Sequence, residues 1–224
     1  MSARQHHPGQ HPSDETLLRC ASGSLGAGLR LVVDVHLESC PRCREQLRLF
    51  ETAGGALLDA LPPAPVSSSS LEKIFARIDA EPAAQPMPRA AAPVRVLDDG
   101  YALPAALAAC EVGPWRFVHP KLRWARVRLP DAPRERVILL KIAPGHATPT
   151  HGHRGLELTQ VLYGAFSGAH GHYGPGDLEE ADEDVKDHEP RVTAEGECLC
   201  LAAVEAPLRI HSLLGRLFQP LMGI

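Results

Sequence analysis

The sequence predicts a multidomain protein in which a small α-helical domain is followed by an all-β domain. Helical periodicity with capping signals runs from about residue 14 to 60, and short β-rich segments separated by Gly/Pro turns begin near residue 95. Two stretches between them, LPPAPVSSSS and EPAAQPMPRAAAP, have the Pro/Ala/Ser-rich composition of linkers. We therefore expect a helical domain over 1–83, a linker over 84–98 and a β domain over 99–224.

Composition bounds the possible functions. The chain has 224 residues, 44% of them hydrophobic, and a formal net charge of −4, which argues against non-specific binding to DNA or anionic membranes. The N-terminus lacks the apolar core of a signal peptide, and no apolar run approaches the ~20 residues of a membrane helix. We expect a cytoplasmic protein, in which the six cysteines bind metal or do redox chemistry more readily than they form disulfides.

Three helices are predicted before the first linker. Ser13 is suited to cap the first helix, and a glycine-rich turn separates it from a second helix over about 29–37. Pro41 suits the first position of a third helix, which continues toward Leu61.

A fourth, short helix is predicted between the linkers. Ser69 and Glu72 form a possible capping box. The apolar residues of this helix fall on one face: Leu71, Ile74, Phe75 and Ile78. This face either packs on its own domain or binds a partner, and the flanking linkers leave it few neighbours within the chain.

The junction of the second and third helices carries an H-x3-C-x2-C string of His36, Cys40 and Cys43. His36 ends one helix and the cysteines begin the next, where a helix N-terminus stabilises thiolates. Structural zinc takes four N or S ligands in a tetrahedron, so the string predicts a zinc site that lacks one ligand.

The fourth ligand is expected among the histidines before the first helix, His6, His7 and His11. We favour His11, because it directly precedes the helix start. A metal-free dithiol is the alternative, although the helical surroundings lack the βαβ context of thioredoxin-like sites. Cys20 is expected to be a core residue of the first helix.

The β domain contains a second group of potential ligands in the segment 145–164. His151 and His153 are two residues apart, so both side chains reach one face of an extended strand, and Glu157 returns to the same cavity. Two imidazoles and a carboxylate suit Zn, Mn or Fe. The segment resembles the first cupin motif, G-x5-H-x-H-x3-E-x6-G, at every defined position, and so implies a cupin-like β-barrel.

The resemblance to cupins also implies a last histidine after a Pro-Gly turn. The turn is present at 173–177, but an acidic segment, 178–187, separates it from His188. We expect the acidic segment to be a solvated loop and His188 to be the fourth ligand, with His170 and His172 as loop residues that could substitute for it.

The remaining cysteines and histidines carry weaker expectations. Cys198 and Cys200 alternate on a strand and therefore share a face, either as small hydrophobes inside the barrel or as a redox-sensitive pair near the metal. Cys110 is expected in a core or linker position. No role is predicted for three other histidines, His119, His146 and His211.

Both motifs together resemble a known family. The first string, with His11, is similar to the zinc-containing anti-sigma motif, and the order of zinc domain and cupin resembles ChrR-type anti-sigma factors. The resemblance implies a regulator rather than an enzyme. It would form a 1:1 complex with an extracytoplasmic-function sigma factor, block the binding of that factor to RNA polymerase, and release it under singlet oxygen or organic hydroperoxide stress. It implies zinc at the first cluster and a second zinc on His151, His153, Glu157 and His188.

Two other functions remain open from the sequence. A cupin with three histidines and a glutamate can bind Fe or Mn and act as a dioxygenase or isomerase, although no substrate-positioning set is evident. A thiol-redox sensor without structural metal is the third possibility.

Overall fold

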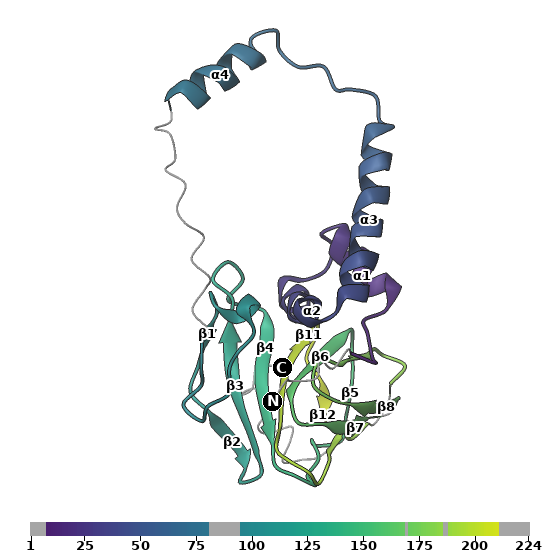
Figure 1. The fold of residues 1–224 in the computed structure, drawn as a ribbon, viewed down its shortest axis with the longest axis vertical. Coiled ribbons are helices and arrows are strands. Elements are labelled where there is room, and N and C mark those ends of the chain that lie inside the picture. Colours follow the sequence, from purple (N-terminus) through teal and green to yellow (C-terminus); the bar gives the residue numbers. More distant parts are fainter. Residues whose placement is uncertain (1–7, 81–94, 169, 186–187, 211–224) are drawn as a thin grey trace, which may run out of the picture.

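The computed structural model describes residues 8–80, 95–168, 170–185 and 188–210. Helices precede strands along the chain, and the β domain lies below the helices in Figure 1. The helices are α1 (Asp14–Ala21), α2 (Ala27–Ser39), α3 (Pro41–Asp59) and α4 (Ser70–Ala80), followed by a 3-10 helix, η1 (Ala105–Leu107).

Helices α1 and α3 begin where their capping residues predict, whereas α2 begins at Ala27 without a side-chain cap. The Ser13 hydroxyl accepts a hydrogen bond from the Thr16 N–H at 3.1 Å, which caps α1. Cys40 caps α3 and Pro41 occupies its first turn. Local sequence therefore sets these helix starts. No helix among the described residues is long and apolar enough to cross a membrane.

The strands pair antiparallel throughout the described residues. The main sheet has the order β1-β3-β4-β11-β6-β9, with β2 paired to β3. Its strands are β1 (Glu111–Val112), β2 (Arg116–His119), β3 (Leu122–Arg128), β4 (Arg136–Ile142), β6 (Glu157–Tyr163), β9 (Leu178–Ala181) and β11 (Cys198–Val204). Two smaller sheets complete the domain, β10 (Arg191–Val192) with β7 (Phe166–Gly168) and β8 (Gly171–Tyr173), and β12 (Arg209–Ile210) with β5 (His151–Gly152).

The expectation that 178–187 is a solvated loop is wrong for its first four residues. Leu178–Ala181 forms β9, which pairs with β6. The two faces of this strand have different partners: Glu179 is buried, whereas Glu180 accepts hydrogen bonds from the Ser13 N–H and hydroxyl, each at 2.8 Å. The remaining described acidic residues of the segment, 182–184, are exposed in a turn, as expected for a solvated loop.

Strand β11 is buried on both faces, as all seven of its residues are buried. Leu199, Leu201 and Ala203 belong to the same core cluster as the apolar residues of α2. Cys198 and Cys200 lie on the opposite face in a cluster with aromatic and aliphatic residues of the barrel interior, so they share one face as expected. A sheet covered on its outer face explains the continuous apolar run CLCLAAV.

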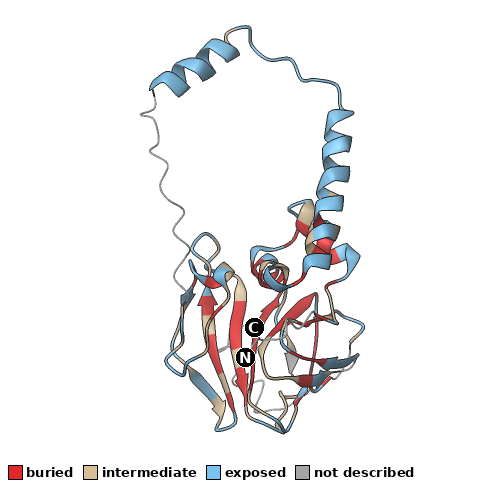
Figure 2. Ribbon diagram, viewed as in Figure 1, coloured by how far each residue is buried: buried red, intermediate tan, exposed pale blue. Residues whose placement is uncertain are grey.

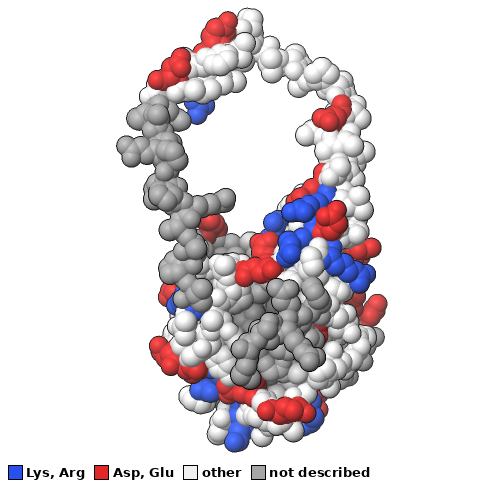
Figure 3. Space-filling view, viewed as in Figure 1, with Lys and Arg blue, Asp and Glu red and all other residues white. Residues whose placement is uncertain are grey.

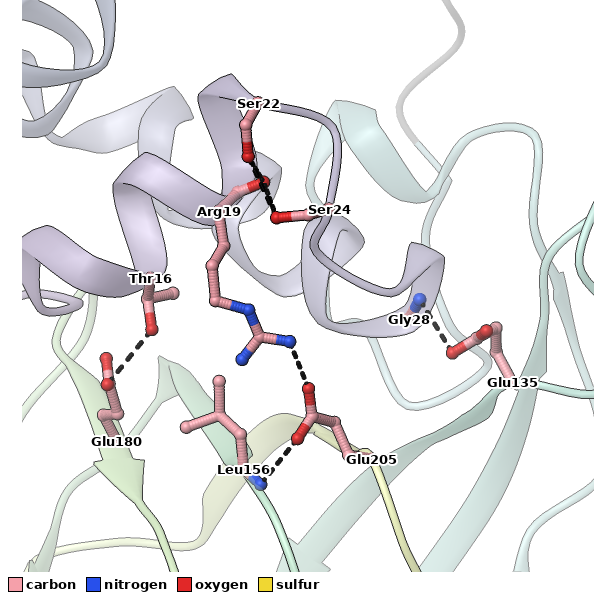
Figure 4. A network of polar contacts seen from close by, with 9 residues as sticks. All are labelled: Thr16, Arg19, Ser22, Ser24, Gly28, Glu135, Leu156, Glu180 and Glu205. Atoms are coloured by element: carbon pink, nitrogen blue, oxygen red, sulfur yellow. Dashed lines mark hydrogen bonds and ion pairs between the residues drawn. The ribbon is translucent and has the colours of Figure 1, made fainter. Parts of the chain in front are cut away.

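Helix α2 provides that cover, so the helices dock directly on the β domain (Figure 2). Its buried residues include Leu29, Val32 and Val33. Polar contacts between the helices and the β domain add to this apolar contact (Figure 4). Arg19 pairs with Glu205 at 2.5 Å, and the Gly28 N–H donates a hydrogen bond to the carboxylate of Glu135, just before β4, at 3.1 Å. The helical segment and the β domain thus share one core.

The C-terminal part of α3 and all of α4 lie away from this core (Figures 1 and 2). No residue of α4 is buried, and its apolar face is more than half exposed, with Phe75 at 55% and Leu71 at 62%. Of the two alternatives for this face, packing on its own domain does not occur among the described residues. Charged side chains gather instead where the helices meet the β domain, and the segment between α3 and α4 shows few of them (Figure 3).

The close approach of α2 to the sheet generates a stability prediction. A Cβ added at Gly28 would lie 2.8 Å from Glu135 Oε2 and 2.9 Å from Val137 Cγ2. We expect Gly28→Val to lower the free energy of unfolding by roughly 1–3 kcal/mol through overpacking, measured by urea denaturation. Gly54→Val is the matched control, because a Cβ at Gly54, also helical, meets no atom within 4 Å. Equal stability of the two variants would contradict the close contact.

Candidate metal centres

The first candidate metal centre lies where α2, α3 and the segment before α1 meet. His11 precedes α1, His36 is in the last turn of α2, Cys40 caps α3 and Cys43 is in its first turn. One ligand atom from each residue lies within 4.8 Å of all the others. His6 and His7, the alternatives to His11, lie outside the described residues.

The spacing of these atoms suits a tetrahedral ion. The Nδ1 atom of His11 lies 3.4 Å from Cys40 Sγ, 3.5 Å from Cys43 Sγ and 3.5 Å from His36 Nε2. Zinc bonds of about 2.3 Å to sulfur and about 2.0 Å to nitrogen place tetrahedral ligand atoms about 3.5 Å apart. The N-terminal region therefore contains a two-histidine, two-cysteine group compatible with zinc.

Burial sets the protonation of this group. Desolvation lowers the pKa of His36 to about 4, so the imidazole is neutral near pH 7 and can offer a lone pair. Burial, together with the neighbouring Cys40, raises the pKa of the Cys43 thiol to about 12. Without a cation the thiol keeps its proton, and metal binding must displace it.

The β domain also contacts this group, which sequence patterns did not predict. The Nδ1 atom of His36 lies 3.1 Å from Gln160 Oε1 and 3.1 Å from the Gly176 carbonyl oxygen. A bond from Nδ1–H to either oxygen leaves Nε2 free to face the cysteines. The only sequence feature that could have indicated this contact is Gln160 itself, a polar residue within the largely buried strand ELTQVLY.

The second candidate centre lies inside the β-barrel, where three imidazoles converge. His188 Nε2 lies 2.9 Å from His153 Nε2 and 3.0 Å from His151 Nε2. Backbone pairing places His188: it and His151 form an isolated antiparallel bridge with N–H···O distances of 3.1 and 3.2 Å. The acidic segment that separates His188 from the turn in sequence therefore does not keep it from the cluster.

Glu157 lies beside these histidines without joining their convergence point. Its Oε2 atom is 3.9 Å from His151 Nε2, and it is 3.2 Å from Nδ1 of His153, the nitrogen that points away from the other rings. The structure thus groups His151, His153 and His188 within 4.8 Å of one another, with the Glu157 carboxylate at the edge.

The polar atoms of this cluster fit a cation. His151 Nδ1 donates to the Pro149 carbonyl at 2.8 Å, which leaves Nε2 as an acceptor. Three facing ring nitrogens cannot all be acceptors without a shared proton or a metal. Glu157 Oε2 is buried and forms no hydrogen bond among the described residues, although it lies 3.2 Å from His153 Nδ1. Burial raises the pKa of Glu157, but His153, His151 and His188 outweigh it and lower this pKa to about 2.

A largely apolar cavity adjoins His151 and Glu157, and Glu179 and Cys200 contribute to its wall. Burial and the charge of Glu157 raise the pKa of Glu179 to about 8, so this carboxyl is largely protonated near pH 7. The hydrogen bond with Cys198, at an Sγ–Sγ distance of 3.5 Å, and burial raise the pKa of the Cys200 thiol. Cys200 is therefore a poor thiolate nucleophile.

The other histidines and cysteines lie outside both clusters. His119 and His146 contact neighbouring backbone atoms, and His170 and His172 are exposed, the latter on β8 rather than in a loop. Cys20 and Cys110 are buried in the core, as predicted. His211 lies outside the described residues.

Comparisons with known proteins agree with this arrangement. A family model described as the ChrR cupin-like domain matches residues 104–206. The anti-sigma-E factor ChrR of Cereibacter sphaeroides is 37% identical, over 96% of this chain and 98% of that protein. The crystal structure of Rhodobacter sphaeroides SigE in complex with the anti-sigma ChrR matches with a TM-score of 0.68 and 35% identity, covering 88% of this chain and 98% of the matched chain.

The sequence identity extends over nearly the full length of both chains, so it includes both the helical segment and the β domain. On this evidence the chain belongs to the ChrR family of anti-sigma factors.

Proposed function

We propose that this protein is an anti-sigma factor that binds an extracytoplasmic-function sigma factor one-to-one and blocks its association with RNA polymerase. The observation that carries the proposal is the similarity, over 96% of this chain, to an anti-sigma factor, a relative of which is also seen in complex with a sigma factor. The protein is on this proposal a cytoplasmic regulator, without enzymatic activity, and contacts neither nucleic acid nor membrane directly.

Residues 1–83 are proposed to bind the sigma factor. Zinc on His11, His36, Cys40 and Cys43 would hold α2, α3 and the segment before α1 in one arrangement. Beyond that group, α3 and α4 present apolar side chains to solvent, including Leu57 at 72% exposure and Ile78 at 60%. Exposed apolar surface on helices that extend from a core supports a partner-binding role.

Residues 99–224 are proposed to receive the signal, with 84–98 as the linker. A second zinc would be held by His151, His153 and His188, with Glu157 as the carboxylate ligand. The convergent Nε2 atoms and the buried, unpartnered Glu157 oxygen support this assignment. The signal is proposed to be oxidative, of the singlet oxygen or organic hydroperoxide type, and to end in release of the sigma factor.

The first prediction concerns the zinc ligands. Cys43→Ser should lose the N-terminal zinc and abolish copurification with a co-expressed extracytoplasmic-function sigma factor, because metal ligation stabilises a small domain by on the order of 10 kcal/mol. Cys110→Ala, at a buried thiol outside both clusters, should retain both properties. Full sigma binding by Cys43→Ser would reject the structural role of zinc.

The second prediction concerns the exposed face of α4. Replacing Phe75 and Ile78 together by alanine should weaken sigma binding by roughly 10- to 100-fold, as expected for apolar anchors of an interface, measured by calorimetric titration. Lys73→Ala, at an exposed position of the same helix, should bind normally. Unchanged affinity of the double variant would place the interface elsewhere.

The third prediction concerns the metal content. Purified protein should contain two zinc ions per chain, and His188→Ala should reduce this to one, measured by elemental analysis. His172→Ala, which alters an exposed histidine on β8, should leave both. Iron in the second site together with oxygen consumption would instead favour the enzymatic alternative.

A further inference from the structure

We propose that the β domain completes the N-terminal metal centre: Gln160 and Asp177 act as positioning residues for the ligands His36 and His11. Metal retention at that centre is then coupled to docking of the two domains. The inference rests on zinc binding by the N-terminal cluster, as proposed above.

The contact to His36 is fully buried. His36 is 0% exposed and Gln160 is 2% exposed, and the two acceptors of the ring, Gln160 Oε1 and the Gly176 carbonyl, both come from the β domain. The amide of Gln160 is itself oriented by a 3.2 Å bond from Nε2 to the Val161 carbonyl. A ligand histidine whose other nitrogen is hydrogen-bonded is fixed in tautomer and ring orientation. Here the fixing groups belong to the other domain.

The contact to His11 runs through the backbone before it. Asp177 Oδ1 accepts hydrogen bonds from the Gly9 N–H at 2.6 Å and the Gln10 N–H at 3.0 Å. The Leu178 N–H in turn donates to the Gln10 carbonyl at 3.3 Å. Asp177 is held in place because its Oδ2 atom accepts from the Gly174 N–H at 2.8 Å within the turn before β9. These bonds position the residue directly preceding His11, so the ring can reach the two cysteines.

The strand that contacts His36 also borders the barrel cluster through Glu157. Along β6, Glu157 and Thr159 line the barrel cavity, whereas Leu158 packs in the core shared with α2 and Gln160 contacts His36. Because side chains alternate along a strand, β6 has Glu157 beside the barrel cluster on one face and Gln160 beside His36 on the other. A change at the barrel metal that shifts β6 would also move Gln160 relative to His36.

Coupling of this kind is reciprocal. If docking of the β domain improves the geometry of His36 and His11, zinc at these ligands must stabilise docking by the same free energy. Loss of the hydrogen bonds between Gln160 and His36 and between Asp177 and the backbone before His11 is therefore expected to weaken zinc binding, even though all four ligands remain in the chain.

The test uses the full-length chain with Gln160→Met, which preserves length but removes the oxygen acceptor. We expect the zinc affinity of the N-terminal centre, measured by competition with a chelator, to fall at least ~10-fold. This is the loss typical when a hydrogen-bond partner of a metal-bound histidine is removed. The Co²⁺-substituted N-terminal site should also show a shifted visible absorption spectrum. Arg19→Ala is the matched control, since it removes an ion pair between the same domains, Arg19 with Glu205, away from the cluster. It should leave affinity within about twofold and the spectrum unchanged.

Two results would overturn the inference. One is a wild-type zinc affinity and spectrum in Gln160→Met. The other is an equal loss of zinc affinity in Gln160→Met and Arg19→Ala, which would show that Gln160 has no specific role in positioning His36. If Gln160→Met does not fold, Asp177→Ala, which removes the acceptor for the Gly9 and Gln10 N–H groups, tests the same coupling through His11, with the same expected loss and the same overturning outcomes. Failure of the proposed function is distinguishable, because it would appear as wild-type protein that lacks the N-terminal zinc or does not bind sigma factor.

Discussion

Helix α2 packs on the outer face of strands β6 and β11, and the positions of the other parts depend on this contact. It buries Leu29, Val32 and Val33 against a sheet whose opposite face lines the barrel. Apolar burial of this kind contributes about 25 cal/mol per Å² removed from water. It also brings the C-terminal turn of α2, and with it His36, against Gln160.

Because the contact joins the two candidate metal centres, the protein differs from two independent modules joined by a linker. Helix α3 leads away from the core, whereas the docking surface on the β domain is formed by α2 (Figure 1). Strand β6 contacts both regions, through Gln160 beside His36 and through Glu157 in the barrel cavity. The polar contacts around α2, such as Arg19 with Glu205, are partly exposed and contribute little individually, so the apolar face of α2 is the main source of docking stability.

Much of the site could be predicted because ligand strings are local. A spacing of three residues between Cys40 and Cys43 places both sulfurs in the first turn of a helix, and Pro41 and Ser13 mark the helix starts. The pair His151 and His153 likewise depends only on strand geometry. By contrast, the loop expectation is wrong for Leu178–Ala181, because these residues form a strand through pairing with β6, and Glu180 finds its partners only by contact with Ser13 at the start of α1.

The sequence by itself determined most of the helical and β segments and most of the residues that form the two candidate metal clusters, because these follow from short-range periodicity, capping and motif spacing. Only the tertiary structure decided that α2 covers the sheet, how His188 is paired with His151, and that Gln160 and Asp177 contact the helical segment. Those contacts join residues more than 30 positions apart, such as His36 with Gln160 at a separation of 124. They depend on which faces pack together, and a single sequence carries no local signal of that choice.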